Sequence, residues 1–180
     1  MDNLSASSSS DEGLDLAGVS GSFAVVGTGG TINTNGVGAI VIDGNPSLNI
    51  NSLTFQSVSA QNTATGIFIQ DTTGSFTING TGATNGSGGT IQDITQRGAS
   101  FINTQNITLE NVIFDDASTT DDVGCTNLSN TSCHAAIHFQ NVTGATLDNV
   151  DISDSEEQGI NALTLSGFNL LNSTITECGT

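Results

Sequence analysis

The chain has 180 residues and a formal net charge of −17, because 18 acidic residues face a single basic one. Such a surface repels phosphate backbones and anionic lipid headgroups, which argues strongly against nucleic acid as a partner. Apolar residues make up 35% of the chain and aromatic residues only 4%. No apolar run approaches the length of a membrane span, so we expect no membrane insertion and a thin aliphatic core.

Residues 1–17 are rich in serine and acidic side chains. Segments of low hydrophobicity and high charge bury too little apolar surface to offset the entropy of ordering. We therefore expect a disordered leader or at most a loose cap over 1–17, followed by one elongated domain over 18–180.

A repeat runs through the rest of the chain. Each copy opens with a small residue and, in four of the five copies, an isoleucine, and the copies lie 27, 32, 38 and 23 residues apart. A second aliphatic residue follows ten or eleven positions later. The opening pairs are Ala39-Ile40, Gly66-Ile67, Gly98-Ala99, Ala136-Ile137 and Gly159-Ile160, and the second aliphatics are Ile50, Ile78, Leu109, Leu147 and Leu170. Repeats of this length predict a solenoid in which coil stacks on coil.

Inside each copy the apolar residues alternate with polar ones, which indicates short strands with one buried and one solvated face. Stacked copies would pair in parallel, with Ile40, Ile67, Ile137 and Ile160 in one buried column. His138, between two inward residues, is expected to face solvent. The sequence thus predicts an all-β fold, a right-handed parallel β-helix or β-solenoid of about six rungs.

Three asparagines occupy one predicted turn column, at Asn111, Asn149 and Asn172. Stacked amides can hydrogen-bond along the axis of a solenoid. Asparagine also simply suits tight turns, so an amide ladder and plain turn chemistry both remain open.

An inserted loop at about 115–134 separates the third and fourth copies. Cys125 and Cys133 bracket a polar stretch within it. A disulfide between them would hold the loop as disulfides hold many extracellular proteins, whereas Cys178 has no evident mate. The alternative is a pair of free loop thiols.

The same loop concentrates possible metal ligands. Acidic oxygen-rich loops can bind Ca²⁺, although the spacing here matches no EF-hand or nonapeptide repeat. The candidate calcium ligands are Asp115, Asp116, Asp121 and Asp122, and a solvated acidic loop is the simpler interpretation. A zinc site would instead use Cys125, Cys133, His134 and His138, which competes with the disulfide. No other cofactor is expected.

Three segments resemble the right-handed parallel β-helix proteins of bacterial surfaces, adhesin-like repeats with the pectate-lyase-like superfold. They are Ile107-Thr-Leu-Glu-Asn-Val-Ile-Phe114, Ala145-Thr-Leu-Asp-Asn-Val-Asp-Ile152 and Gln158-Gly-Ile-Asn161. The resemblance covers roughly residues 20–180 and implies a secreted or surface-anchored protein. It is specific for the fold and weak for function, since β-helices serve as enzymes, adhesins and phage spikes alike.

Two function classes follow from these observations. The favoured one is a structural or interaction module of an extracellular or cell-surface bacterial protein, an adhesin-like rod that binds carbohydrate or protein. Because Thr180 follows directly on a closing rung, neighbouring rungs of a longer parent chain are expected partners. The alternative is a carbohydrate-active β-helix enzyme, a lyase or hydrolase of acidic polysaccharide. Asp121 and Asp122 are paired carboxylates suited to acid/base work, but Arg97 is the only base available to hold a uronate.

Overall fold

A computed structural model of the chain describes residues 3–120 and 133–179, and within them every regular element is a β-strand. The strands pair in parallel in a single sheet that wraps through about 283°, as in a β-solenoid. They are β1 (Ala6–Ser8), β2 (Leu14–Ala17), β3 (Gly21–Ser22), β4 (Val25–Asn35), β5 (Ile40–Gln61), β6 (Thr65–Ile78), β7 (Gly89–Gln92), β8 (Arg97–Glu110), β9 (Val112–Asp115), β10 (Ala135–Asp148), β11 (Asp151–Ser153), β12 (Gln158–Leu171) and β13 (Thr174–Thr176).

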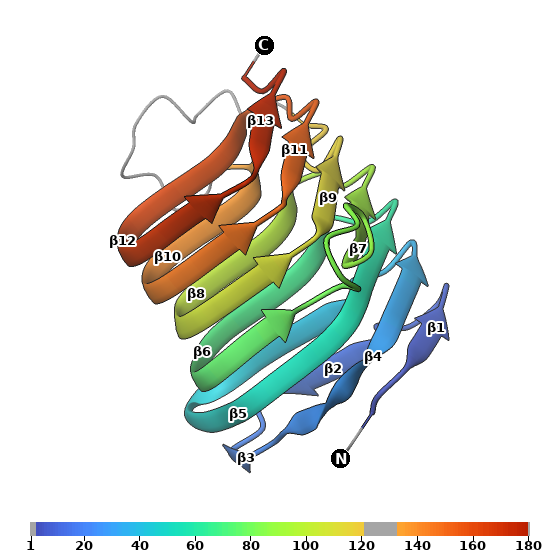
Figure 1. Cartoon of the computed structure of the whole chain (residues 1–180). Helices are drawn as coiled ribbons and strands as arrows, with labels where there is room; N and C mark the ends of the chain where they lie inside the picture. The colour runs from blue at the N-terminus through green and yellow to red at the C-terminus, as the bar shows by residue number, and fades with distance from the viewer. Residues whose placement is uncertain (1–2, 121–132, 180) are drawn as a thin grey trace.

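The long strands and the short strands form two successive parts of this sheet. β5, β6, β8, β10 and β12 lie side by side, and β7, β9, β11 and β13 continue the sheet from the far end of β5 (Figure 1). β6, β8, β10 and β12 are each followed in the chain by a short strand, and each such pair is here called a coil. β5 pairs with both β6 and β7, so it forms a coil by itself. Every coil pairs with the equivalent strands of the coil before it, so successive coils stack.

The predicted buried column is confirmed. Ile40 pairs with Ile67, and the column continues through Ala99 and Ile137 to Ile160. The first four of these side chains are fully buried, and Ile160 on the last coil is half-buried. Alternation of inward and outward residues therefore gives the parallel register that the sequence predicts.

Five phenylalanine rings run through the core from coil to coil. Their centroids lie between 5.6 and 6.3 Å apart along the series Phe55, Phe76, Phe101, Phe139 and Phe168. Tilted or offset pairs at this spacing contribute roughly 0.5–1.5 kcal/mol each beyond the burial of their area. The few aromatic residues of the chain are thus concentrated where they connect the coils.

Residues with positive φ form the corners of the coils. Asp93, Asp116 and Asp154 have φ of 53°, 47° and 55° and follow β7, β9 and β11 in turn. Asparagine and aspartate tolerate this left-handed region better than most L-residues because their short polar side chains bond locally. The amide ladder is confirmed at one step: Asn149 Nδ2 donates to Asn111 Oδ1 at 2.7 Å.

The prediction for the first repeat copy is wrong in its second half. Phe55, not Ile50, pairs with Ile78 and so belongs to the column of Leu109. Ile50 is buried elsewhere, within a part of β5 that shows two register shifts against β6. Extra residues in β5 cause this offset, and an alternating pattern continues across such irregularities without a visible break.

Within the segment 1–17, two short strands join the sheet. β1 pairs with β4, and β2 pairs with β5 so that Leu14 lies beside Ile40. Leu14 thereby extends the buried isoleucine column by one position toward the N-terminus.

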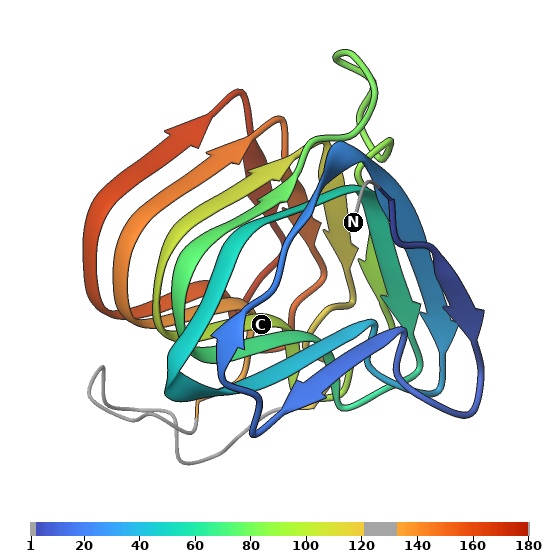
Figure 2. The same cartoon turned by 90° about the horizontal axis from the view of Figure 1, so that it is seen from below.

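A ten-residue excursion, 79–88, separates β6 from β7 and projects from the coil (Figure 2, green). Its two ends are tied together, since Ser87 Oγ accepts from the Thr81 amide at 2.9 Å. It is also tied to the next coil, since Asn111 Nδ2 donates to the backbone oxygens of Asn79 and Gly82 at 3.1 and 3.2 Å.

Candidate functional site

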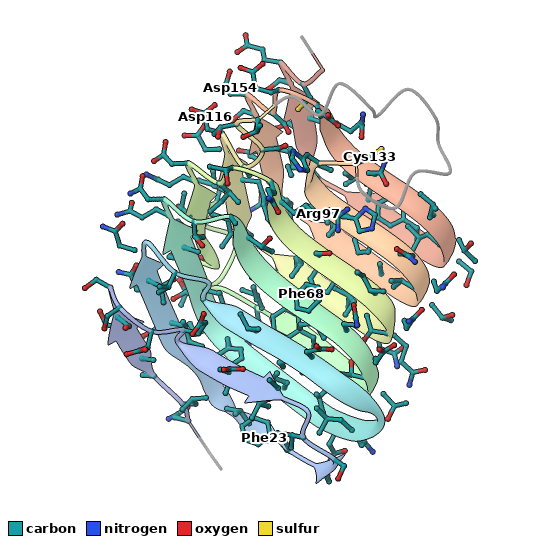
Figure 3. The ribbon with its side chains drawn as sticks, turned by 180° about the vertical axis from the view of Figure 1, so that it is seen from behind. Phe23, Phe68, Arg97, Asp116, Cys133 and Asp154 are labelled. Carbon is teal, nitrogen blue, oxygen red and sulfur yellow. The ribbon has the colours of Figure 1, made fainter. Side chains whose placement is uncertain are left out.

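An acidic hollow lies at the corner that follows β9, β11 and β13. Asp116 lines a cavity of about 410 Å³ together with Asp154, Glu156 and Glu177. Burial, and then the charges of Asp115, Asp154, Asp93 and Glu156, raise the pKa of Asp116 above its ordinary value. Figure 3 shows Asp116 and Asp154 close together at this corner, away from Arg97.

The calcium hypothesis is only partly addressed by this arrangement. Asp115 ends β9 and Asp116 lies in the acidic hollow, whereas Asp121 and Asp122 fall outside the described residues. Among the described residues, no three His, Cys, Asp or Glu side chains are grouped so that they could hold a metal ion. The other acidic residues of the hollow come from the later corners, after β11 and β13. The signal for them in the sequence was the acidic residue that follows each short strand.

A second group of polar side chains lies on the outer face of β8, β10 and β12. The expectation that His138 faces solvent is wrong, because its side chain is 0% exposed. It lies between Ser100 and Asn161 in the sheet register, and its Nδ1 is 3.1 Å from Asn161 Oδ1. Burial, and then the positive charge of Arg97, lower the pKa of His138 to about 4.

Arg97, the only base of the chain, belongs to the same group. Its Nε donates to the backbone oxygen of Cys133 at 3.1 Å, and its Nη1 donates to Ser100 Oγ at 3.4 Å. Burial lowers the pKa of its guanidinium. Arg97 thus fixes the chain where it enters β10, which is the structural role that a turn-adjacent arginine can take.

The cysteines are placed only in part. Cys133 is fully buried beside Arg97 (Figure 3), and Cys125 falls outside the described residues, so a bridge between them stays a prediction. Cys178 is a half-exposed free thiol whose Sγ donates to the Thr176 backbone oxygen at 3.2 Å. The zinc alternative finds no support in the described part, where His138 bonds to Asn161 and His134 Nδ1 lies 3.0 Å from the Thr120 oxygen.

A second hollow, which sequence reasoning missed, lies beside the excursion 79–88. Its volume is about 250 Å³, and we call it the flank pocket. It is lined by Gly82, Ala83, Glu110, Asn111, Asp148, Asn149 and Asn172. The missed signal was the second repeat copy, in which Ala83 stands five positions after Ile78 where the other copies have Phe or Ile.

No protein-family model matches the chain, and no curated protein and no solved structure is significantly similar to it. The structure itself defines the class: an all-β protein with a parallel sheet, consistent with a β-solenoid. Among the described residues no helix is both long enough and apolar enough to cross a membrane.

Proposed function

We propose that this chain is a structural and interaction module of a secreted or cell-surface bacterial protein, built as a right-handed β-helix of about six rungs. It acts as an adhesin-like rod that binds carbohydrate or protein through its flank. The observation that carries the proposal is the unbroken inward stack, in which each coil contacts only its neighbours. Such a stack is stiff along its axis and presents regular outward columns on its sides.

Charge and cysteine content support the extracellular location. A net charge of −17 with one base favours solubility and discourages adhesion to nucleic acid and anionic lipid. A bridge between Cys125 and Cys133 would close the loop at about 115–134 and would need an oxidising compartment.

The apolar edge of the last coil supports a further rung as a partner. Large side chains at the exposed edge of β12 and β13 are between 38% and 47% exposed, namely Phe168, Leu170, Leu171 and Ile175. Three of them continue inward columns that every earlier coil covers with another parallel coil. The occupant that fits this edge is one more coil of a longer parent chain, with aliphatic or aromatic residues in the same register.

The observation that favours the rival class, a carbohydrate-active enzyme, is the proximity of Arg97 to His138. A fully covered imidazole does not contact a polymer, and Arg97 is already bonded to Cys133 and Ser100. Both side chains therefore have structural explanations, and the interaction module is the better account.

A screen of the purified chain tests both classes. Neutral polysaccharides, pectin, polygalacturonate and alginate would be presented with and without Ca²⁺, and both binding and new reducing or unsaturated ends would be read. We expect binding without turnover. Turnover that is lost in Arg97→Ala, or in Asp121→Asn/Asp122→Asn, would establish the enzyme instead, and a chain that neither binds nor turns over any of them loses the carbohydrate part of the proposal.

A further inference from the structure

We infer that the flank pocket binds one uncharged sugar ring of a polysaccharide. This inference rests on the proposed function and adds to it a location and a class of ligand. At about 250 Å³ the pocket lies just below the usual range of ligand cavities, about 300–1,000 Å³, so it suits a single ring and not a folded oligosaccharide.

The floor of the pocket consists of outward side chains from three successive coils. Glu110 and Asp148 are register partners on β8 and β10, so their side chains lie one strand spacing apart on the same face. The amides of Asn111, Asn149 and Asn172 follow at the adjoining corner. Stacking of coils thus repeats hydrogen-bonding groups at a regular interval along the flank.

The wall of the pocket is the excursion 79–88, held rigidly against the floor. Asn111 Nδ2 donates to Gly82 O at 3.2 Å, and Asn149 Nδ2 donates to Ala83 O at 3.4 Å. Asn85 Nδ2 donates to Asp151 Oδ2 on β11 as well. A wall fixed before the ligand arrives loses little entropy on binding, which favours measurable affinity even from a small contact area.

The lining offers the mixture of groups that sugar hydroxyls require. The Glu110 carboxylate makes no hydrogen bond or ion pair with any described residue, so both its oxygens can accept hydroxyl protons. Asp148 uses one oxygen to accept from Asn172 Nδ2 at 2.8 Å. Adjacent hydroxyls of a pyranose can bond to neighbouring acceptors of this kind, with carboxylate bonds being the stronger ones.

One apolar side chain, Leu171, adjoins two of the lining residues, Asp148 in the sheet register and Asn172 in the chain. Leu171 is the register partner of Asp148 and faces outward at the end of the column that begins at Glu110. Its side chain is nearly half exposed on a face that is otherwise polar. The C–H face of a sugar ring could cover part of Leu171 while the hydroxyls bond to the floor.

The charge of the lining selects against acidic sugars. Two carboxylates and no base line the pocket, so a uronate would meet like charges. A metal ion is a poorer match than a hydroxylated ring, because the described residues contain no group of three carboxylate, histidine or cysteine ligands that could hold a cation.

The test compares a double variant of the pocket lining with a double variant of outward residues nearby. Glu110→Ala/Asn172→Ala removes one acceptor and one amide from the pocket. The control, Thr108→Ala/Thr146→Ala, changes two outward residues that lie two positions before Glu110 on β8 and before Asp148 on β10. Dissociation constants would be measured by calorimetry for xylan, mannan, galactan and β-glucan oligosaccharides, with polygalacturonate and chitosan oligosaccharides as charged probes. Circular dichroism and thermal melting would verify that both variants fold.

We expect at least one neutral oligosaccharide to bind, roughly ten-fold more weakly to the pocket variant, since a lost bond to a charged group has about that effect. The control variant should bind within about two-fold of the unchanged chain. If neutral sugars bind and the pocket variant binds equally well, the pocket assignment fails while the proposed function stands. If nothing binds, the carbohydrate part of the proposed function fails, and this inference fails with it. If only chitosan binds, and salt abolishes the binding, charge attraction replaces ring recognition and overturns the inference.

Discussion

His138 Nδ1 on β10 lies 3.1 Å from Asn161 Oδ1 on β12, in the next coil. The amide nitrogen of Asn161 donates to Gln158 Oε1 at 3.2 Å, so the oxygen of this amide is the atom that faces the imidazole. An amide oxygen only accepts, and the hydrogen-bond network therefore assigns the proton of the neutral ring to Nδ1. Nε2 is then a bare acceptor, buried and without a hydrogen-bond partner.

Acid should destabilise the protein through this histidine. The folded pKa of His138 is about 4 because of burial and Arg97, below its ordinary value of 6.5. As the pH falls from 6.5 toward 4, His138 becomes protonated in the unfolded chain but stays neutral in the folded chain. The free energy of unfolding therefore declines as the pH falls. The expected loss is on the order of 2 kcal/mol between about pH 7 and pH 4, after allowance for solvent screening. Urea denaturation across this range measures it.

The matched variant for this prediction is His138→Gln, which can still donate to Asn161 and does not titrate. Carboxyl groups also titrate near the lower end of the window. Asp116, with its raised pKa, has the opposite sign, since the folded state gains relative stability as that group is protonated. Both chains share every carboxylate, so the difference between their curves isolates His138. Parallel curves would show that the imidazole is not the cause.

Gly98 should tolerate no side chain. A Cβ at this position would lie 2.6 Å from the backbone oxygen of Ala136 and 2.8 Å from the ring of Phe114. The Ala136 oxygen belongs to the backbone of the next coil and cannot withdraw without moving that coil, and the Phe114 ring is fully buried. Gly98→Ala should therefore cost about 1–3 kcal/mol or more in the free energy of unfolding. Gly38→Ala is the control, because its nearest neighbours would be 3.1 and 3.2 Å away. Similar losses in the two variants, measured in urea, would contradict this view of close coil packing.

The stacking of the coils was predictable because it depends on periodic, local patterns. An inward residue at Ile67 and a small residue before it repeat in each copy, and parallel pairing then follows. Irregular segments were not predictable in the same way. The register shifts in β5 displaced Ile50 from its expected column, because alternation alone does not reveal extra residues within a strand.

The candidate sites were harder to predict, since they depend on which coils lie side by side. The flank pocket joins the excursion 79–88 to Glu110 and Asp148, and only the stacking brings these segments together. His138 was placed on the correct outward face, yet its burial depends on what covers that face. The alternation of apolar and polar residues distinguishes the inner face of a coil from its outer face. It does not show which other residues bury a side chain on the outer face.

The Cys125–Cys133 bridge is expected in protein produced under oxidising conditions. Closing a loop of this size should stabilise the chain by roughly 2–3 kcal/mol. Mass spectrometry of non-reduced peptides spanning 115–140 should give a linked mass that separates on reduction. Cys178, free and half-exposed, should react with an alkylating agent before reduction and so serves as the internal control. Alkylation of Cys125 and Cys133 in the unreduced protein would reject the bridge.

The stability of each coil should depend on its inward aliphatic residues and on their place in the stack. Leu147 is fully buried between Leu109 and Leu170, so Leu147→Ala should cost roughly 2–5 kcal/mol in the free energy of unfolding. Thr146→Ala, one residue away and outward, loses a 3.4 Å bond from Asn169 and should cost well under about 1 kcal/mol.

A third variant tests the exposed edge of the last coil. Leu170 occupies the same column as Leu147 but is 41% exposed, so Leu170→Ala should cost clearly less than Leu147→Ala. Chemical denaturation followed by circular dichroism gives all three values, and an unchanged denaturant slope would show that the variants unfold as one unit. Equal losses for Leu147 and Thr146 would mean that the inward and outward faces are misassigned. Should Leu170→Ala cost as much as Leu147→Ala in the full chain, another element must cover this edge in solution, as it would if a further coil or a second copy stacked on it.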